Sequence, residues 1–350
     1  MKKLIFILII SLIIFCSCDR RPLEYVSEEN AAIAIKYDWQ KAFSETPTGV
    51  TLIAYGSNGS TQQNTSNNTT NMPLNLEVGE WKMLSFNLST TEFNSFTFNK
   101  MENYDSAQVK LNNMESDTYT NGAWDKGVTY KQEPEDLAVI TDTIRITEDM
   151  VYSSKNFNTT GSDTTTKTYE IKVTPKPVNT KFTIRIRVYN INSIKNSIGS
   201  ISGLAGGYIL TSHHASTDRA TFLLQDLKTT VDSTGSTSGW LTVTLSTFGL
   251  PYGKENSNAR IDTDNILTLY LQLSDDKTEK LLTYNVGSMI NYAKEVTRAL
   301  EPTTGVTQNL LLIINNGPEL PKIDNGTSGG SGFDAEVDNW GDGGNVDIDI

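Results

Sequence analysis

Short segments in which apolar and polar residues strictly alternate constrain the fold of this chain more than any other feature of its sequence. The segments TIRIRV (residues 183–188), WLTVTL (240–245) and LTLYLQL (267–273) each repeat an apolar residue at every second position. Alternation with a period of two is the pattern of a β-strand with one face in a core and the other in solvent. Residues 310–314, LLLII, are apolar throughout and indicate a buried strand.

The first half of the chain has the same character, with one long polar interruption. Its β-rich segments are residues 31–39, 49–55, 80–88, 93–99, 139–146 and 168–173. The stretch GSNGSTQQNTSNNTTN at 56–71 cannot bury a face, so we interpret it as a long surface loop. One short helix is predicted near residues 288–300, where apolar residues recur at helical spacing before Pro302. Many strands and one helix predict an all-β protein made of two successive β-sandwiches.

The start of the chain has the composition of a bacterial lipoprotein signal. Two lysines precede an apolar run over residues 4–15, which is shorter than the roughly 20 residues that a membrane span needs. The sequence FCSC at 15–18 resembles a lipobox, with the small Ser17 directly before Cys18. Cleavage after Ser17 would make Cys18 the lipid attachment site and hold the protein on a membrane through its lipid anchor. The alternative is ordinary secretion, with two cysteines near the start by chance.

Cysteine content and net charge argue against several classes of site and partner. Cys16 and Cys18 are its only cysteines, so a cleaved, lipidated chain has no disulfide, thiolate nucleophile or cysteine metal site. Loss of Lys2 and Lys3 with the signal changes the net charge from −12 to −14. An acidic surface argues against a nucleic-acid partner, which requires a basic face. We therefore expect no metal, no cofactor and a body that is monomeric when isolated.

The boundaries of the predicted parts follow from composition. The prolines of TPKP at 174–177 stiffen the backbone and remove strand donors, which indicates a domain boundary. From residue 317 the composition shifts to a Gly-rich linker and an acidic end. The predicted organisation is a signal peptide at 1–17, a lipidated tether at 18–30, an N-terminal β-sandwich at 31–174, a C-terminal β-sandwich at 175–316, and a Gly-rich linker with an acidic terminal strand at 317–350.

The last residues of the chain have the pattern of a strand rather than that of a random tail. Val346, Ile348 and Ile350 alternate with Asp347 and Asp349. We expect this strand to pair with a sheet edge, either of its own second domain or of another subunit. Docking onto its own second domain is the favoured alternative, because so short a strand buries little.

Several further segments, taken in their order, resemble one known family. The segment SGLAGG at 202–207 lies within a strand-like stretch, and YDWQKAF at 37–43, TPKP at 174–177, TFGLP at 247–251 and VDNWG at 337–341 accompany it. Together with the lipobox they make the chain similar to the Bacteroidales fimbrillin-like lipoproteins, the fimbrial anchor and minor-subunit group. The resemblance implies two transthyretin-like β-sandwiches, no catalysis, and a role as a fimbrial component in fimbria assembly and adhesion, with other fimbrial subunits as partners.

The resemblance also implies a location and a modification. It implies an outer-membrane lipoprotein at the cell surface, although Arg20 and Arg21 stand where surface-exported relatives often carry acidic residues, which leaves a periplasmic-facing protein open. Export pathways of this bacterial order glycosylate Asp-Ser/Thr sequences, which Ser106, Thr143 and Thr164 fit. Anchor, tip and accessory roles remain open.

The sequence contains a few residues that could indicate catalysis, metal binding or sugar binding, but none lies in the pattern typical of such a site. The segment GTSGG at 326–330 matches G-x-S-x-G but lies in a linker rather than in the strand–turn–helix of a nucleophile elbow. His213 and His214 are interpreted as surface loop residues, and the glycines at 203–207 as a bulge or a site of close backbone packing. An exposed Trp124 could stack on a sugar. The alternative function is accordingly a glycan-binding surface lipoprotein of a polysaccharide-uptake system, and a hydrolase ranks third.

Overall fold

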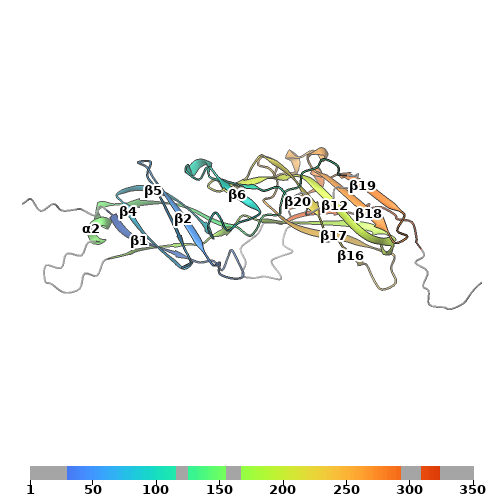
Figure 1. Ribbon diagram of the computed structural model, residues 1–350, viewed down its shortest axis with the longest axis horizontal. Helices are drawn as coiled ribbons and strands as arrows, with labels where there is room; N and C mark the ends of the chain where they lie inside the picture. The colour runs from blue at the N-terminus through green and yellow to red at the C-terminus, as the bar shows by residue number, and fades with distance from the viewer. Residues whose placement is uncertain (1–29, 116–124, 155–166, 293–308, 324–350) are drawn as a thin grey trace, which may run out of the picture. The chain divides into compact units, whose positions relative to one another are not determined.

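The structure is a computed structural model that describes residues 30–115, 125–154, 167–292 and 309–323. Strands dominate the described residues (Figure 1), which confirms the predicted all-β fold. The chain divides into two compact units, and the last boundary between them lies between Lys176 and Pro177. The second unit also includes Thr90–Met101 and Asp105–Leu137, which a simple boundary at 174/175 would assign to the first.

The first unit consists of a three-stranded and a five-stranded sheet. The orders are β4-β1-β9 and β10-β8-β5-β2-β3, and β1 pairs antiparallel with β4 and parallel with β9. The elements are β1 (Asn30–Tyr37), β2 (Val50–Gly56), β3 (Thr61–Ser66), β4 (Asn71–Glu77), β5 (Gly79–Asn87), β8 (Ala138–Ile146), helix α2 (Glu148–Ser154), β9 (Tyr169–Val173) and β10 (Lys176–Pro177).

Both sheets contribute to the core of the first unit. Ile33 and Ile35 of β1 are buried together with Leu52 of β2 and Trp81 of β5. Tyr37 bonds Ser85 within this core at 2.9 Å, which satisfies its hydroxyl. The alternation therefore predicts correctly that Ile33, Ile35 and Tyr37 of β1 enter the core, whereas β2 and β5 are buried on both faces over most of their length.

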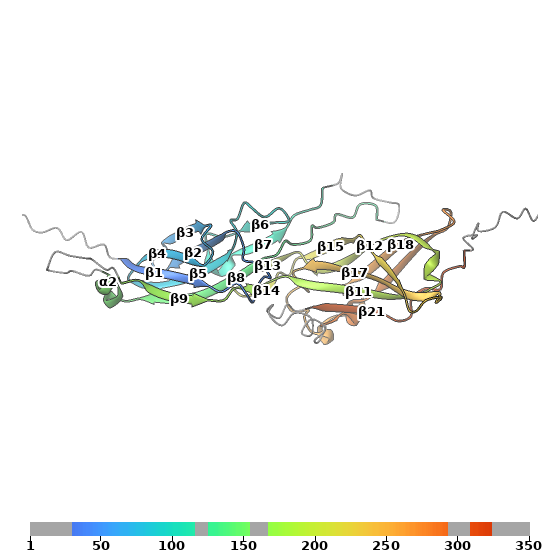
Figure 2. The same cartoon turned by 90° about the horizontal axis from the view of Figure 1, so that it is seen from below.

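The second unit contains two larger sheets and a small one (Figure 2). Their orders are β16-β17-β11-β21-β20, β15-β12-β18-β19 and β14-β13-β7-β6. The strands are β6 (Phe96–Asn99), β7 (Gln108–Leu111), β11 (Thr180–Tyr189), β12 (Ile194–Ala205), β13 (Gly207–Ile209), β14 (His214–Ala215), β15 (Arg219–Leu224), β16 (Lys228–Val231), β17 (Ser238–Thr247), β18 (Ile266–Leu273), β19 (Glu279–Asn285), β20 (Asn291–Tyr292) and β21 (Leu310–Ile314). The 3-10 helices are η1 (Tyr104–Ser106), η2 (Ile191–Ser193), η3 (Ser257–Ala259), η4 (Asp262–Asp264) and η5 (Gly287–Met289).

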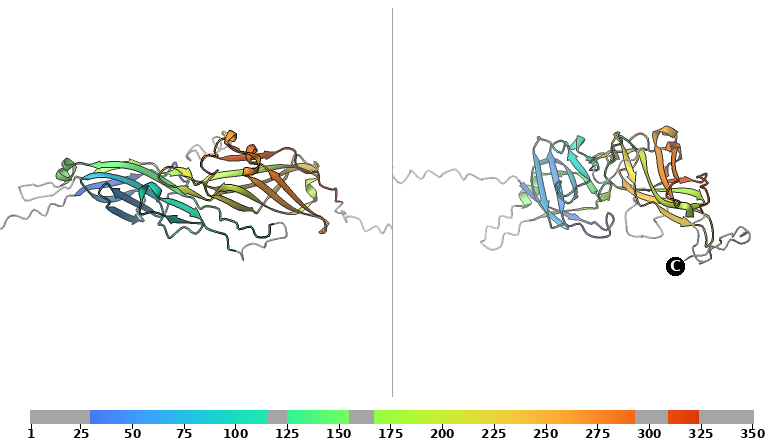
Figure 3. Two further views of the ribbon diagram at one scale, coloured as in Figure 1. Left: turned by 90° about the horizontal axis from the view of Figure 1, so that it is seen from above. Right: turned by 45° about the vertical axis from the view of Figure 1, so that its right-hand side comes forward.

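The two units repeat one topology, and Figure 3 gives two further views of their sheets. The first contains the orders β4-β1-β9 and β3-β2-β5-β8, and the second contains β17-β11-β21 and β15-β12-β18-β19. Numbered within each unit, these orders are the same, and in each the first strand pairs parallel with the last. This arrangement of two facing sheets is that of a transthyretin-like β-sandwich, so the predicted pair of sandwiches is confirmed.

Two local expectations were wrong. The polar stretch at 56–71 is not only a loop, because its residues 61–66 form β3, which pairs with β2 at a sheet edge. An edge strand can be polar on both faces, since its backbone bonds and not its side chains hold it. Residues 287–289 and 291–292 form η5 and β20 rather than the start of an α-helix, and residues 293–300 lie outside the described residues. The α-helix among the described residues is α2, where Glu148 and Asp149 occupy the favourable first turn.

Candidate functional site

The outward face of one sheet in the second unit carries a row of basic and aromatic side chains. Along β11, buried apolar residues alternate with residues that face outward. The outward residues of β11 are Lys181, Thr183, Arg185, Arg187 and Tyr189. The same alternation on β17 turns Trp240, Thr242 and Thr244 outward. We call this set of residues, with Lys228 and Thr230 of β16, the basic sheet face.

Register brings the arginines of the basic sheet face onto its tryptophan. Arg187 lies directly opposite Trp240, and Arg185 lies opposite Thr242. The guanidinium carbons of Arg185 and Arg187 lie 4.6 Å and 5.3 Å from the centre of the Trp240 ring, and that of Arg187 lies 5.8 Å from the Tyr189 ring. Guanidinium groups stack favourably on aromatic rings in this range. Tyr189 is 42% exposed, so one ring of the stack is open to solvent.

Of the two arginines on this face, only Arg187 forms an ion pair with a described carboxylate. Arg187 donates two hydrogen bonds of 2.5 Å to the carboxylate of Asp232. By contrast, no described carboxylate forms an ion pair with Arg185. Lys228 is opposite Thr242 on its other side and is exposed. Because directly opposite residues share one face of a sheet, Arg185 and Lys228 flank Thr242 and leave positive charge available at this point.

A cavity of about 450 Å³ adjoins β17. Its wall combines the outward Thr242 and Thr244 and the inward Val243 and Leu245 of β17 with Leu223 and Leu224 at the end of β15. The remaining polar lining comes from the segments Lys131–Gln132–Glu133 and Gln225–Asp226, and from Lys228. Apolar side chains therefore line this space together with hydroxyl, amide and charged groups of both signs, and Thr242 and Thr244 connect it with the basic sheet face.

Glu133 is fixed at the rim of this cavity by backbone contacts. Its carboxylate accepts a 2.7 Å hydrogen bond from the Ser246 amide of β17. The buried Asn179 holds the following segment, because its side-chain amide donates to the carbonyls of Pro134 and Glu135 and to the Ser246 hydroxyl. Burial raises the pKa of the Glu133 carboxyl, while the Ser246 amide and the nearby Lys181 oppose this rise.

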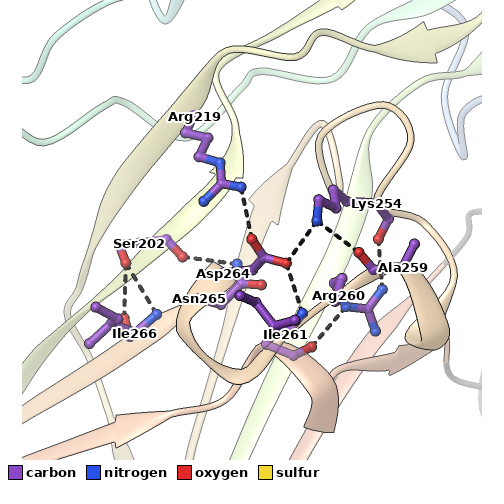
Figure 4. A network of polar contacts seen from close by, with 10 residues as sticks. Ser202, Arg219, Lys254, Ala259, Arg260, Ile261, Asp264, Asn265 and Ile266 are labelled. Carbon is purple, nitrogen blue, oxygen red and sulfur yellow. Dashed lines mark hydrogen bonds and ion pairs between the residues drawn. The ribbon is translucent and has the colours of Figure 1, made fainter.

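A second polar cluster fastens the loops at residues 251–266 and 287–290 of the second unit (Figure 4). Asp264 accepts hydrogen bonds from Arg219 at 2.8 Å, from Lys254 at 3.2 Å and from the Ile261 amide at 2.9 Å. Arg260, only 5% exposed, donates to the backbone carbonyls of both loops. Each charged group of this cluster already has protein partners. We therefore assign the cluster a structural role.

We expect Asp264→Asn to lower stability at neutral pH, by an amount that shrinks under acid. The Ile261 amide chiefly, with Arg219 and Lys254, holds the pKa of Asp264 at about 2 against an opposing effect of burial. A carboxyl whose pKa falls on folding stabilises the fold only while it is ionised. Its contribution is thus complete above its ordinary pKa of 3.8 and is lost as pH falls toward 2. Thermal midpoints of both proteins across this window test the expectation, and a constant difference between them contradicts it.

The positions predicted from the sequence lie in different parts of the chain. Ser106 ends η1 and Thr143 lies at an exposed position of β8, so the structure does not bring them together. Trp39 and Trp81 are buried, whereas Trp240 is half-buried on the basic sheet face. The other predicted positions lie outside the described residues. They are Cys18, Thr164, Trp124, Ser328 of the linker, and the terminal Val346, Ile348 and Ile350.

The two histidines and the glycine cluster at 203–207 lie in the second unit. His213 is exposed in a turn, and His214 stacks on Tyr252 with ring centres 4.0 Å apart. No group of His, Cys, Asp and Glu within the described ranges is arranged to hold a metal ion. Gly203 has a φ of +78° at a bulge in β12, between Ile201 and Leu204. The prediction of a bulge at this glycine cluster is therefore confirmed.

Sequence reasoning missed the basic sheet face, although its signal was present. The alternating TIRIRV segment fixes which residues of β11 point outward, and two of them are arginines on a chain with a net charge of −12. Two arginines on the outward side of one strand are a local reversal of charge. Their stacking on Trp240 depends on the pairing of β11 with β17, more than fifty residues away, and no spacing rule predicts it.

Comparison with solved structures shows what this fold is similar to. A candidate adhesin from Bacteroides ovatus aligns with a TM-score of 0.51 and 17% identity, over 83% of this chain and 94% of that one. A candidate polysaccharide-binding protein from Bacteroides thetaiotaomicron aligns with a lower TM-score of 0.45 and 10% identity, over 82% of this chain and 92% of that one. The fimbrial anchor protein Mfa2 from Porphyromonas gingivalis aligns with a TM-score of 0.42 and 10% identity, over 81% of this chain and 90% of that one. The likeness to the Bacteroides ovatus protein confirms the predicted family resemblance at the level of the fold.

Comparison by sequence gives the family. No protein of curated function matches the sequence. Among the described residues no helix is both long and apolar enough to cross a membrane. The model of the family described as "Domain of unknown function (DUF5119)" matches residues 17–225, which is more than half of the chain. The chain therefore belongs to the DUF5119 family.

Proposed function

We propose that this protein is a cell-envelope lipoprotein that serves as a component of fimbriae, in their assembly and in adhesion. The observation that carries the proposal is the repeated sandwich, whose fold is shared with the Bacteroides ovatus candidate adhesin over most of both chains. The lipobox resemblance at Cys18 supplies the attachment to the outer membrane, and the cell surface is its favoured side.

The sheet edges offer a route to subunit contacts. Among the described residues β9 pairs with β1 on one side only, so it is an edge of the three-stranded sheet. An exposed edge presents backbone donors and acceptors that a strand of another subunit can pair with. The terminal strand at Val346, Ile348 and Ile350 is a further candidate for such pairing, within this chain or between chains. Neither route requires a catalytic site, and we propose no enzymatic activity.

Cys18→Ala is expected to move the protein from the membrane fraction to the soluble fraction. Each acyl methylene buried in a membrane contributes about 0.8 kcal/mol, so loss of the acylated cysteine removes the anchor. Cys16→Ala is the matched control, because Cys16 lies within the predicted signal and is removed with it. Fractionation with immunoblotting measures both. Membrane partitioning that survives Cys18→Ala, or that is lost equally in the control, contradicts the lipidation.

The fimbrial role has its own experiment. Immunogold labelling of intact cells locates the protein, and pulldown from detergent extracts identifies attached subunits. We expect surface labelling and recovery of fimbrial subunits with the wild-type protein. Labelling only after permeabilisation would indicate the periplasmic side, and extracts without any fimbrial subunit would contradict the proposal.

A further inference from the structure

We propose that the basic sheet face and the adjoining cavity bind an acidic polysaccharide, whose carboxylate or sulfate groups pair with Arg185 and Lys228. This inference rests on the adhesive role proposed above and names its ligand class. It starts from a contrast within the molecule, because a chain with a net charge of −12 gathers cations on one sheet face.

The local charge is positive. Arg185 has no ion-pair partner among the described carboxylates, whereas Arg187 is held by Asp232. Basic side chains on the face and in the cavity wall are Lys131, Lys181, Arg185, Arg187 and Lys228, against the acidic Glu133, Asp226 and Asp232. An anionic partner meets complementary charge here, and the acidic remainder of the chain repels it from other surfaces.

The shape and chemistry of the face fit a sugar chain. The Trp240 and Tyr189 rings both lie against the Arg187 guanidinium, and the half-exposed Tyr189 offers aromatic surface beside this positive charge. Hydroxyl groups of Thr242 and Thr244 follow along β17 and lead into the cavity. A cavity of about 450 Å³ is within the range of small-molecule sites. Aromatic platforms with nearby hydroxyl, amide and charged groups match the mixed apolar and polar surfaces of sugar rings.

A peptide strand fits this place less well. Peptides that add to sheets use the backbone of an edge strand, but β17 is paired with β11 along its length and with β16 over residues 239–242. Beyond β16, Glu133 already accepts the Ser246 amide, which is a donor that an added strand would need. Recognition at this face therefore depends on side chains, which favours a polysaccharide over an acidic peptide.

Binding of the full mature chain to polygalacturonate, heparin, dextran and polyglutamate tests the inference. We expect binding to polygalacturonate or heparin and not to dextran or polyglutamate, with polygalacturonate reporting carboxylates and heparin reporting sulfates. Arg185→Gln and Lys228→Gln should each weaken the binding about tenfold, because a charge-assisted hydrogen bond is lost. Each should also reduce the salt dependence, since fewer counterions are released. Lys280→Gln, on an exposed position of β19 in the other large sheet, is the matched control and should bind as wild type.

The outcomes separate this inference from the proposed function. Absence of binding to both acidic polysaccharides overturns the inference, as does equal binding of polyglutamate or an equal loss in Lys280→Gln. Thermal unfolding of each variant verifies that binding is compared between folded proteins. If fimbrial subunits are recovered in the pulldown while polysaccharide binding fails, only the inference falls. If binding holds while no fimbrial subunit is recovered, only the fimbrial role falls.

Discussion

Gly203→Ala is expected to destabilise the second unit by about 3–5 kcal/mol, which is a large part of the stability of an ordinary domain. Gly203 adopts a φ of +78°, a conformation that is unfavourable for alanine. An added Cβ atom would also lie 2.0 Å from the Asp264 carbonyl oxygen. Because that oxygen belongs to the backbone of η4, it cannot move aside without displacing the fastened loop.

Gly206→Ala is the matched control within the same sequence segment. A Cβ atom at Gly206 would meet its nearest neighbour, in Asp218, at 3.5 Å, which is an ordinary contact. Urea unfolding followed by tryptophan fluorescence measures both variants. We expect a large loss of stability for Gly203→Ala and little for Gly206→Ala. Equal stabilities would show that the bulge at Gly203 is not required by the fold.

The sequence predicts the strands whose side chains divide between a core and solvent. β11, β17 and β18 lie where the alternation indicates, because one side of each faces a core. β3 and β4 escape this signal for different reasons. β3 has no buried residue, and β4 contains Pro73, which an edge strand tolerates but which a sequence pattern counts against.

The pairing of distant segments is the part that the sequence does not predict. The parallel pairs β1 with β9 and β11 with β21 join the first and last strands of each sandwich, and no local pattern encodes them. The candidate site depends on the same kind of contact. Glu133 reaches Ser246 from a segment more than one hundred residues away, so its place beside the basic sheet face follows only from the fold.

Arg260→Met is expected to destabilise the second unit by about 3–5 kcal/mol. The buried guanidinium donates to four carbonyls, those of Gly287 at 2.8 Å, Lys254 at 2.9 Å, Glu255 at 3.0 Å, and Ile290. Methionine fills a similar volume but leaves these carbonyls without their donor, and each buried unpaired group is costly. Burial lowers the pKa of Arg260, with Tyr292 and Asp264 opposing, but a guanidinium remains charged at every pH at which the protein folds.

Arg219→Met separates the contribution of burial from that of charge. Arg219 pairs with Asp264 in the same cluster, but its side chain is 50% exposed, and exposed ion pairs contribute about 0–1 kcal/mol. Arg260→Lys should recover little of the loss, because one ammonium group cannot reach carbonyls on both loops. Hydrogen exchange should then increase at residues 254–264 and 287–290 in Arg260→Met and not in Arg219→Met. Similar losses of stability in the two methionine variants would mean that charge near Asp264, and not the bridging of two loops by a buried arginine, holds this end of the sandwich together.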